Sequence, residues 1–165
     1  MRIFLLGFMG CGKSTIGKDL AKKMHFDFID LDDYITKKEG ITIKQIFKKK
    51  GELAFRKMEE IALLEVSQKN NIVIATGGGT PCFFENMKNI LEKGKSIYLK
   101  MRVEELNKIL KHQQNQRPLI INKSNEELLR FISSTLSERE QYYTQADFIV
   151  EGNKGRVKSI LDLLT

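Results

Sequence analysis

An eight-residue glycine-rich segment near the N-terminus constrains this chain most. Residues 7–14 read Gly-Phe-Met-Gly-Cys-Gly-Lys-Ser and match the pattern G-x-x-x-x-G-K-[ST]. The apolar residues 3–6 before it predict a buried strand, and residues 14–23 after it have the apolar spacing of a helix. In such a unit the glycines let backbone N–H groups turn around phosphate oxygens, and the helix N-terminus adds partial positive charge. The segment therefore predicts a phosphate-binding loop.

The rest of the chain alternates short apolar runs with segments of helical spacing. Further strands are expected at residues 26–29, 72–75, 96–99 and 148–150. Helices are expected at residues 51–68, 103–111 and 125–142. Strands that are apolar throughout, with helices between them, indicate a parallel sheet covered on both faces. The prediction is an α/β P-loop fold: a three-layer sandwich with a central parallel sheet of about five strands flanked by helices, in one domain spanning residues 1–165.

Acidic residues at strand ends bear on the reaction, which a phosphate-binding loop alone does not specify. The strand at 72–75 ends in Thr76-Gly77 without an acid, which disfavours motor and nucleic-acid-remodelling ATPases. Asp30 and Asp32 follow the strand at 26–29, and their spacing places both carboxylates on one side of an extended segment. Such a pair suits one role at a metal and another at a hydroxyl nucleophile. Alternatively, Asp32 or Asp33 caps a helix that begins at about residue 34.

Residues 112–124 interrupt the alternation with a polar sequence that includes Gln-Gln-Asn-Gln-Arg-Pro. A connection of this length between two helices is often a functional lid. We therefore expect a mobile lid at about residues 112–124, with Arg117 on it. The alternative is that Arg117, which precedes Pro118, is a plain turn residue.

Charge and cysteine content limit the partners and the compartment. The net charge of +7 is compatible with nucleic acid, an acidic membrane surface or a polyphosphate ligand. The sequence has no recognised nucleic-acid motif and no run of about 18 apolar residues, so neither nucleic acid nor a membrane is expected as a partner. Cys11 and Cys82 are too few for a disulfide framework, and no signal-peptide pattern is present. These features favour a cytoplasmic location.

Several segments together resemble the shikimate kinase family, in the family's order and approximate spacing over about residues 2–164. They are Gly10-Cys11-Gly12-Lys13-Ser14-Thr15, Asp30-Leu31-Asp32, Gly51-Glu52-Leu53-Ala54-Phe55-Arg56, Gly77-Gly78-Gly79, Arg117-Pro118-Leu119 and Glu138-Arg139. The phosphate loop alone is shared by many families, whereas its combination with the other segments is far more specific. The resemblance implies ATP-dependent phosphorylation of the 3-hydroxyl of shikimate, in chorismate and aromatic amino-acid biosynthesis. It also implies ATP and Mg²⁺ as cofactors, with a monomer as the default state.

The resemblance assigns roles to individual residues. Lys13, Asp32 and Arg117 would be catalytic, with Asp32 on the substrate hydroxyls and Arg117 closing over ATP. The residues expected to bind the nucleotide are Gly10, Cys11, Gly12, Lys13, Ser14, Thr15 and Arg117, and those expected near Mg²⁺ are Ser14 and Asp30. The residues expected to bind shikimate are Asp32, Arg56, Gly77, Gly78, Gly79 and Arg139, partly within a helical region at about residues 33–61. Forked arginines suit the substrate carboxylate, and a Cβ at the triplet would obstruct its approach.

Some assignments have simpler alternatives. Arg56 could merely pair with Glu59 or Glu60 at helical spacing, and Arg139 could pair with a neighbouring acid. Thr76 could take the acid's place at the strand end, while His25 and His112 are expected at the surface. Leu110-Lys111-His112 stands where the family often has an arginine for adenine, and residues 152–154 match its adenine loop weakly.

Other functions with the same loop remain open at this point. A gluconate kinase or a nucleoside monophosphate kinase would share the fold, and a nucleic-acid-binding ATPase would suit the positive charge. The two arginines and the glycine triplet favour shikimate over these alternatives.

Overall fold

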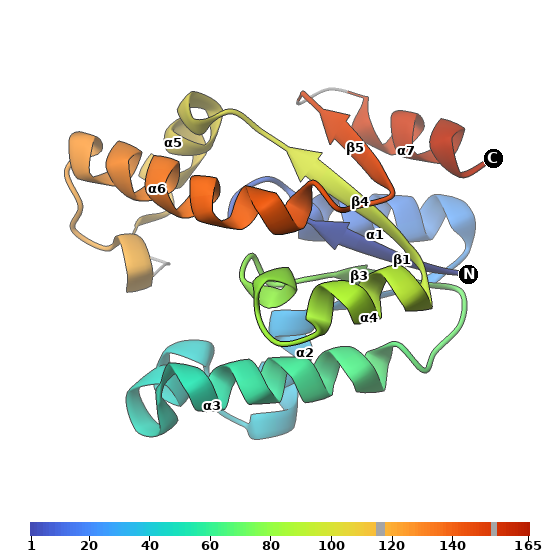
Figure 1. The fold of residues 1–165 in the computed structure, drawn as a ribbon, viewed down its shortest axis with the longest axis horizontal. Helices are drawn as coiled ribbons and strands as arrows, with labels where there is room; N and C mark the ends of the chain where they lie inside the picture. The colour runs from blue at the N-terminus through green and yellow to red at the C-terminus, as the bar shows by residue number, and fades with distance from the viewer. Residues whose placement is uncertain (115–117, 153–154) are drawn as a thin grey trace.

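Five parallel strands form the centre of the part of the chain that the structure describes, residues 1–114, 118–152 and 155–165 of a computed structural model. They are β1 (Arg2–Leu6), β2 (Asp27–Asp30), β3 (Ile72–Ala75), β4 (Lys95–Lys100) and β5 (Phe148–Glu151), in the order β2-β3-β1-β4-β5 (Figure 1). Every neighbouring pair is parallel. The expected parallel sheet of five strands is therefore confirmed, and each expected strand lies within about a residue of its observed bounds.

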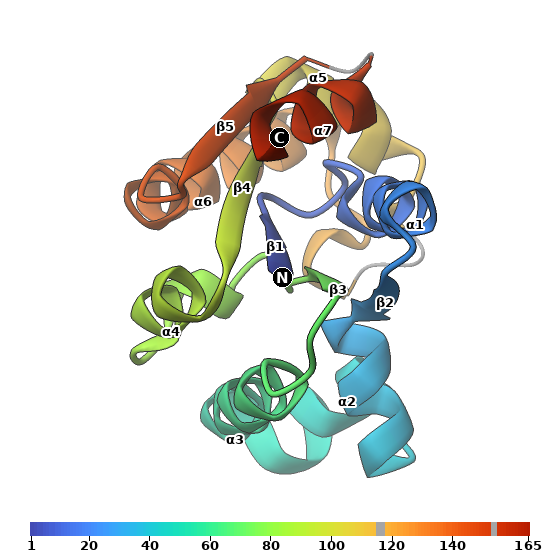
Figure 2. The same ribbon diagram turned by 90° about the vertical axis from the view of Figure 1, so that its right-hand side faces the viewer.

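Helices cover both faces of the sheet, as expected. They are α1 (Lys13–Met24), α2 (Leu31–Glu39), α3 (Ile43–Val66), α4 (Asn86–Lys93), α5 (Val103–Lys111), α6 (Asn125–Tyr143) and α7 (Arg156–Leu164). Figure 2 shows α1 and α7 on one face and α4 and α6 on the other. The three-layer sandwich explains why the central strands are apolar throughout, since β3 is buried along its whole length.

Two helices differ from the sequence prediction. α3 begins at Ile43 instead of residue 51, and Gly51 interrupts it with a φ of 82° and a ψ of 172°. A residue with a side chain rarely adopts this φ, so the glycine marks a kink between two helical segments. Lys48, Lys49 and Lys50 end the first segment and are exposed, as expected for a solvated helix end. α2 begins at Leu31, three residues before the expected start.

One hydrophobic core joins the sheet to the helices on both faces. Its buried residues run from Ile3 in β1 to Ile160 in α7. No helix among the described residues is long and apolar enough to cross a membrane.

The region of the expected lid is described except for residues 115–117, so Arg117 lies outside the described residues. A short 3-10 helix, η3 (Pro118–Ile120), follows, and the Ile120 side chain is fully buried. The neighbouring Leu119 and Ile121 are 52% and 44% exposed. Buried and exposed apolar side chains thus alternate along this segment.

Candidate active site

The phosphate-binding loop connects β1 to α1, as the sequence predicts. Gly7, Gly10 and Gly12 have φ angles of 140°, 81° and 92°, which side chains rarely allow, so the loop's path requires glycine there. The Lys13 ammonium donates to the carbonyl oxygens of Gly7 at 2.7 Å and Phe8 at 3.0 Å. These bonds keep the positive charge of Lys13 within the curve of the loop.

Arg156, at the start of α7, forms hydrogen bonds to the backbone of this loop and of β4. Its Nη1 donates to the carbonyl oxygen of Cys11 at 2.7 Å, and its Nη2 donates to the carbonyl oxygen of Lys100 at 3.0 Å. The side chain is buried, and this loss of water lowers its pKa. Sequence reasoning did not single out Arg156, because its partners lie far away in the chain.

Asp30 ends β2 and caps α2. Its Oδ1 accepts hydrogen bonds from the backbone N–H groups of Asp32 at 3.0 Å and Asp33 at 3.4 Å. The expectation that Asp32 or Asp33 caps the helix is therefore wrong, because Asp30 reaches the free N–H groups of the first turn. Asp32 is helical, so the argument that both acids share one side of an extended segment is wrong as well.

The Ser14 hydroxyl donates a hydrogen bond to Oδ2 of Asp30. This contact joins the start of α1 to the end of β2, next to Lys13. A hydroxyl oxygen and a carboxylate oxygen are the hard donors that Mg²⁺ prefers, so the two residues expected near the metal fit that ion chemically.

A pocket of about 630 Å³ lies next to the phosphate-binding loop. Its walls come from the loop, α2, α3, the glycine triplet, the end of the lid segment and α6. The lining residues are Met9, Asp32, Asp33, Thr36, Thr42, Ile43, Lys44, Phe47, Phe55, Arg56, Glu59, Gly77, Gly78, Gly79, Leu119, Ile121 and Arg139. All of the residues expected to bind shikimate therefore meet at one cavity.

Asp32 faces this pocket from the first turn of α2. Part of the residue is exposed to solvent, but desolvation of its carboxylate is the largest of the causes that raise its pKa to about 6. The nearby carboxylates of Glu59 and Asp30 raise the pKa further, against the opposing effects of Lys13 and Arg56. A carboxylate with this pKa can accept a proton near neutral pH.

Arg56 is held firmly in the pocket wall. Its Nη1 donates to Oε2 of Glu59 at 3.0 Å, and its Nη2 donates to Oε1 of Glu52 at 3.3 Å. The guanidinium carbon also lies 4.2 Å from the centre of the Phe83 ring. The expected alternative, a pair with Glu59 at helical spacing, is thus present, and Arg56 lines the pocket at the same time.

Glu59 organises this wall, although the sequence suggests it only as a partner for Arg56. Its side chain is 1% exposed, and its Oε1 accepts a hydrogen bond from the Thr80 hydroxyl at 2.6 Å. A buried carboxylate needs such charged and hydrogen-bonding partners, and Arg56 and Thr80 supply them. Glu59 thereby connects α3 to the segment after the glycine triplet.

Arg139 approaches the pocket from α6. Within the described part of the chain it forms no ion pair, so the alternative of a neighbouring acid is not found there. Its guanidinium carbon lies 5.8 Å from the centre of the Phe8 ring. The pocket therefore has one arginine fixed by acids and another whose charge is available to a ligand.

The glycine triplet allows these side chains to approach its backbone. A Cβ at Gly77 would lie 2.7 Å from Oε1 of Glu59, and one at Gly79 would lie 2.6 Å from Nη1 of Arg56. A Cβ at Gly78 would lie 3.1 Å from Nη1 of Arg139. A Cβ at Gly77 or Gly79 would therefore collide with the pocket's charged side chains, whereas one at Gly78 would only crowd Arg139.

Two further polar contacts were not predicted as such. The Tyr143 hydroxyl donates a hydrogen bond to the carbonyl oxygen of Gly78. The Thr76 hydroxyl donates to the carbonyl oxygen of Leu5 at 3.0 Å, which assigns it to the sheet rather than to a metal.

His25 and His112 are exposed, as expected, and so is Lys111. Residues 153 and 154 of the weak adenine-loop match lie outside the described residues.

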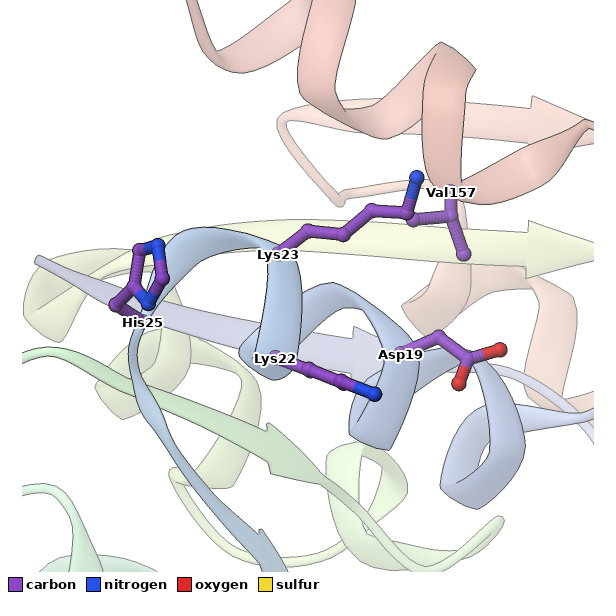
Figure 3. Close-up of a pocket in the computed structure, with 5 residues that line it drawn as sticks. All are labelled: Asp19, Lys22, Lys23, His25 and Val157. Carbon is purple, nitrogen blue, oxygen red and sulfur yellow. The ribbon is translucent and has the colours of Figure 1, made fainter.

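A second hollow, of about 570 Å³, lies beside α1 and α7. Its lining consists of Asp19, Lys22, Lys23, His25 and Val157. Figure 3 shows that the side chains of Lys22, Lys23 and His25 spread apart instead of converging on one point. The candidate active site is therefore the first pocket, next to the phosphate-binding loop.

Known proteins resemble this chain over almost its whole length. A family model described as "SKI: Shikimate kinase" matches residues 9–164. A shikimate kinase from Parabacteroides distasonis is 44% identical over 153 residues, which cover 93% of this chain and 88% of that protein. A crystal structure of shikimate kinase from Bacteroides thetaiotaomicron is 39% identical with a TM-score of 0.92, covering 99% of this chain and 96% of that one. A structure of shikimate kinase from Acinetobacter baumannii in complex with shikimate is 34% identical with a TM-score of 0.88, covering 99% and 92%.

Proposed function

This chain belongs to the shikimate kinase family, and from that premise we propose how its residues divide the work of the reaction. The enzyme is a transferase that uses ATP with Mg²⁺ to phosphorylate shikimate, in the pathway to aromatic amino acids. The observation that carries the proposal is the pocket in which Asp32, two arginines and the glycine triplet meet beside the phosphate-binding loop.

The two arginines would bind the substrate carboxylate. Arg139 brings a guanidinium without an ion pair in the described structure, and Arg56 brings one whose orientation is fixed by Glu52 and Glu59. A guanidinium matches a carboxylate through two parallel hydrogen bonds, which a lysine cannot provide. The ring of the substrate would then lie along the glycine triplet, with its hydroxyl groups directed toward Asp32.

Asp32 would accept the proton of the reacting hydroxyl. As the 3-hydroxyl oxygen forms its bond to the γ-phosphorus, the bond from that phosphorus to the leaving ADP oxygen breaks, and the hydroxyl proton passes to the Asp32 carboxylate. The raised pKa of Asp32, about 6, makes it a better base than an ordinary aspartate while leaving it ionised at neutral pH.

The phosphate-binding loop would hold ATP through its backbone N–H groups and Lys13. The residues proposed for this role are Gly10, Cys11, Gly12, Lys13, Ser14 and Thr15. Lys13 would exchange its bonds to the carbonyl oxygens of Gly7 and Phe8 for bonds to phosphate oxygens. Ser14 and Asp30 would hold the metal ion, and Mg²⁺ would neutralise charge on the phosphate oxygens when bound.

The lid would close over the reacting groups. Leu119 and Ile121 line the pocket yet expose much of their apolar surface, which closure onto a substrate would bury. Closure would exclude water, so that the phosphoryl group passes to the hydroxyl instead of being hydrolysed. We also propose that Arg117 on this lid stabilises the charge on the transferred group.

We further propose a single-domain, cytoplasmic monomer that binds neither nucleic acid nor a membrane. The shared hydrophobic core supports one domain, and the free thiols of Cys11 and Cys82 suit a reducing compartment. Arg56 and Arg139 line the pocket and Lys13 lies in the adjacent loop, where we propose that they meet a small anionic substrate and not a nucleic acid.

The position of phosphorylation tests this proposal. After incubation of shikimate with ATP and Mg²⁺, a phosphorus–proton correlation spectrum should connect the new phosphorus to the proton on carbon 3 of the ring. A correlation to the proton on carbon 4 or 5 would refute the proposed placement of the substrate against Asp32.

A further inference from the structure

We propose that Tyr143 is a positioning residue for the substrate: by holding the carbonyl of Gly78, it fixes the backbone N–H groups that the glycine triplet presents to the pocket. The inference rests on the proposed function, because it names the substrate as the group that these N–H donors meet. It concerns a residue that lies behind the pocket wall and does not line the pocket.

The Tyr143 hydroxyl is well suited to this task. Tyr143 is the last residue of α6, its side chain is fully buried, and its hydroxyl donates to the Gly78 carbonyl oxygen. Burial raises its pKa above the ordinary value, an effect that the nearby Arg139 charge opposes, so the phenol keeps its proton. α6 packs against the segment that follows β3, which includes η1 (Thr80–Cys82) (Figure 1).

The peptide bond transmits this hydrogen bond to the pocket. Because a trans peptide is planar, the N–H of Gly79 points opposite to the carbonyl of Gly78. Glycine backbones are otherwise free to rotate, so a bond to the carbonyl selects one orientation of this peptide. Tyr143 therefore determines where the Gly79 N–H is directed.

The N–H groups of the triplet are free to bind a ligand. Gly78 and Gly79 both line the pocket, and neither N–H has a hydrogen-bond partner among the described residues. The carbonyl oxygens on either side are occupied, since Thr80 donates to Gly77 at 3.1 Å and Cys82 donates to Gly79 at 2.9 Å. Backbone N–H groups without partners, next to carbonyl oxygens that already have theirs, form a binding site for an anion or a hydroxyl group.

The same face of α6 carries the cation of the site. Arg139 precedes Tyr143 by four residues, which places the two side chains one above the other on the helix. A Cβ at Gly78 would touch Nη1 of Arg139 at 3.1 Å, while the Gly78 carbonyl accepts from Tyr143. One helix face therefore fixes both the charge and the backbone donors relative to each other.

The Tyr143→Phe variant tests this role, with Tyr98→Phe as its matched control. The two rings lie 5.0 Å apart, but the buried Tyr98 hydroxyl has no hydrogen bond to the glycine triplet. Loss of the Tyr143 hydroxyl should raise the KM for shikimate by about tenfold, while the KM for ATP stays within about twofold. Tyr98→Phe should leave both constants within about twofold of the wild type. All rates are compared at a temperature where circular dichroism shows each variant folded.

The proposal is overturned if the KM for shikimate is unchanged in Tyr143→Phe, if both KM values rise together, or if Tyr98→Phe behaves identically. A second measurement needs no substrate, and so separates this inference from the proposed function. In protein labelled with ¹⁵N-glycine, the amide signals of Gly78 and Gly79 should move in Tyr143→Phe and stay in place in Tyr98→Phe. Unmoved signals in both variants would refute the role of Tyr143 even if shikimate is the substrate.

Discussion

Arg56 and Glu59 form an ion pair at 3.0 Å inside the pocket wall, with side chains that are only 8% and 1% exposed. Glu59 also accepts from Thr80 at 2.6 Å and is one of the charges that raise the pKa of Asp32. A single buried carboxylate thus orients a pocket-lining cation and adjusts the basicity of the proposed proton acceptor. This connection makes Glu59 the most informative residue outside the expected site.

Glu59→Gln should move the pH dependence of the reaction. In the proposed mechanism kcat/KM falls at acid pH as Asp32, whose pKa is about 6, becomes protonated. Removing the negative charge of Glu59 removes a cause of the raised pKa, and this fall in kcat/KM should shift to lower pH. The control is Glu60→Gln on the same helix, since Glu60 pairs with Lys57 at 3.0 Å. If the acid side of the kcat/KM profile stays at the same pH in Glu59→Gln, Glu59 does not raise the pKa of the proton acceptor.

The two pocket arginines should differ in their effect on stability. Arg56→Ala leaves Glu59 buried without its charged partner, which costs about 3 kcal/mol of unfolding free energy. Arg139→Ala removes a charge that has no ion pair in the described structure, so its cost should stay below about 1 kcal/mol. Both substitutions should raise the KM for shikimate by at least about tenfold while sparing the KM for ATP. Urea denaturation followed by circular dichroism supplies the free energies, and equal losses in both variants would be inconsistent with the structure.

Asp32→Asn should stabilise the protein at neutral pH while abolishing turnover. The pKa of Asp32 is about 6 in the folded protein and near 3.8 when unperturbed, so between these values the folded state binds more protons. Stability from this group is therefore lost as the pH rises from about 4 to about 6. The melting temperature of Asp32→Asn should exceed that of the wild type at pH 8, with the difference shrinking toward pH 4. Asp33→Asn, at the next position of α2, is the matched control. An equal pH-dependent gain in Asp33→Asn would show that the effect does not come from Asp32.

Arg156→Met should weaken ATP binding specifically. Arg156 holds the carbonyl oxygen of Cys11 at 2.7 Å and thereby the peptide that joins Cys11 to Gly12 in the phosphate-binding loop. Its loss should raise the KM for ATP by about tenfold with little change in the KM for shikimate. Arg102→Met is the matched control, since the Arg102 side chain is 83% exposed. A selective rise in the KM for shikimate instead would show that Arg156 does not act through the loop.

The sequence predicts most of the fold because each strand is recognisable as a short apolar run. Strands covered on both faces are apolar throughout, and the loop at residues 7–14 identifies the first strand and helix. The sequence predicts the start of α2 too late because the cap depends on which N–H groups the Asp30 side chain reaches. The first segment of α3 was missed because the lysine-rich sequence before Gly51 carries a weak apolar pattern.

Asp32, Arg56, Arg139 and the glycine triplet, which the family resemblance supplies, line one pocket, whereas the residues that support them do not follow from the sequence. Asp32, Arg56 and Arg139 could be named in advance because each stands in a recognisable motif. Tyr143 and Arg156 act on carbonyl groups 65 and 145 residues away, so only the folded chain brings them to their partners. Their signal in the sequence is no more than a polar group on a helix that also packs into the core.

The release of ADP with a panel of acceptors tests the central claim most directly. The purified protein is mixed with ATP and Mg²⁺ and then with shikimate, gluconate, a nucleoside monophosphate, single-stranded DNA or no acceptor. We expect ADP release to rise far above the background with shikimate and to stay at the background with every other addition. ADP release driven by gluconate, by the nucleotide or by DNA, with shikimate left at the background, would contradict the account.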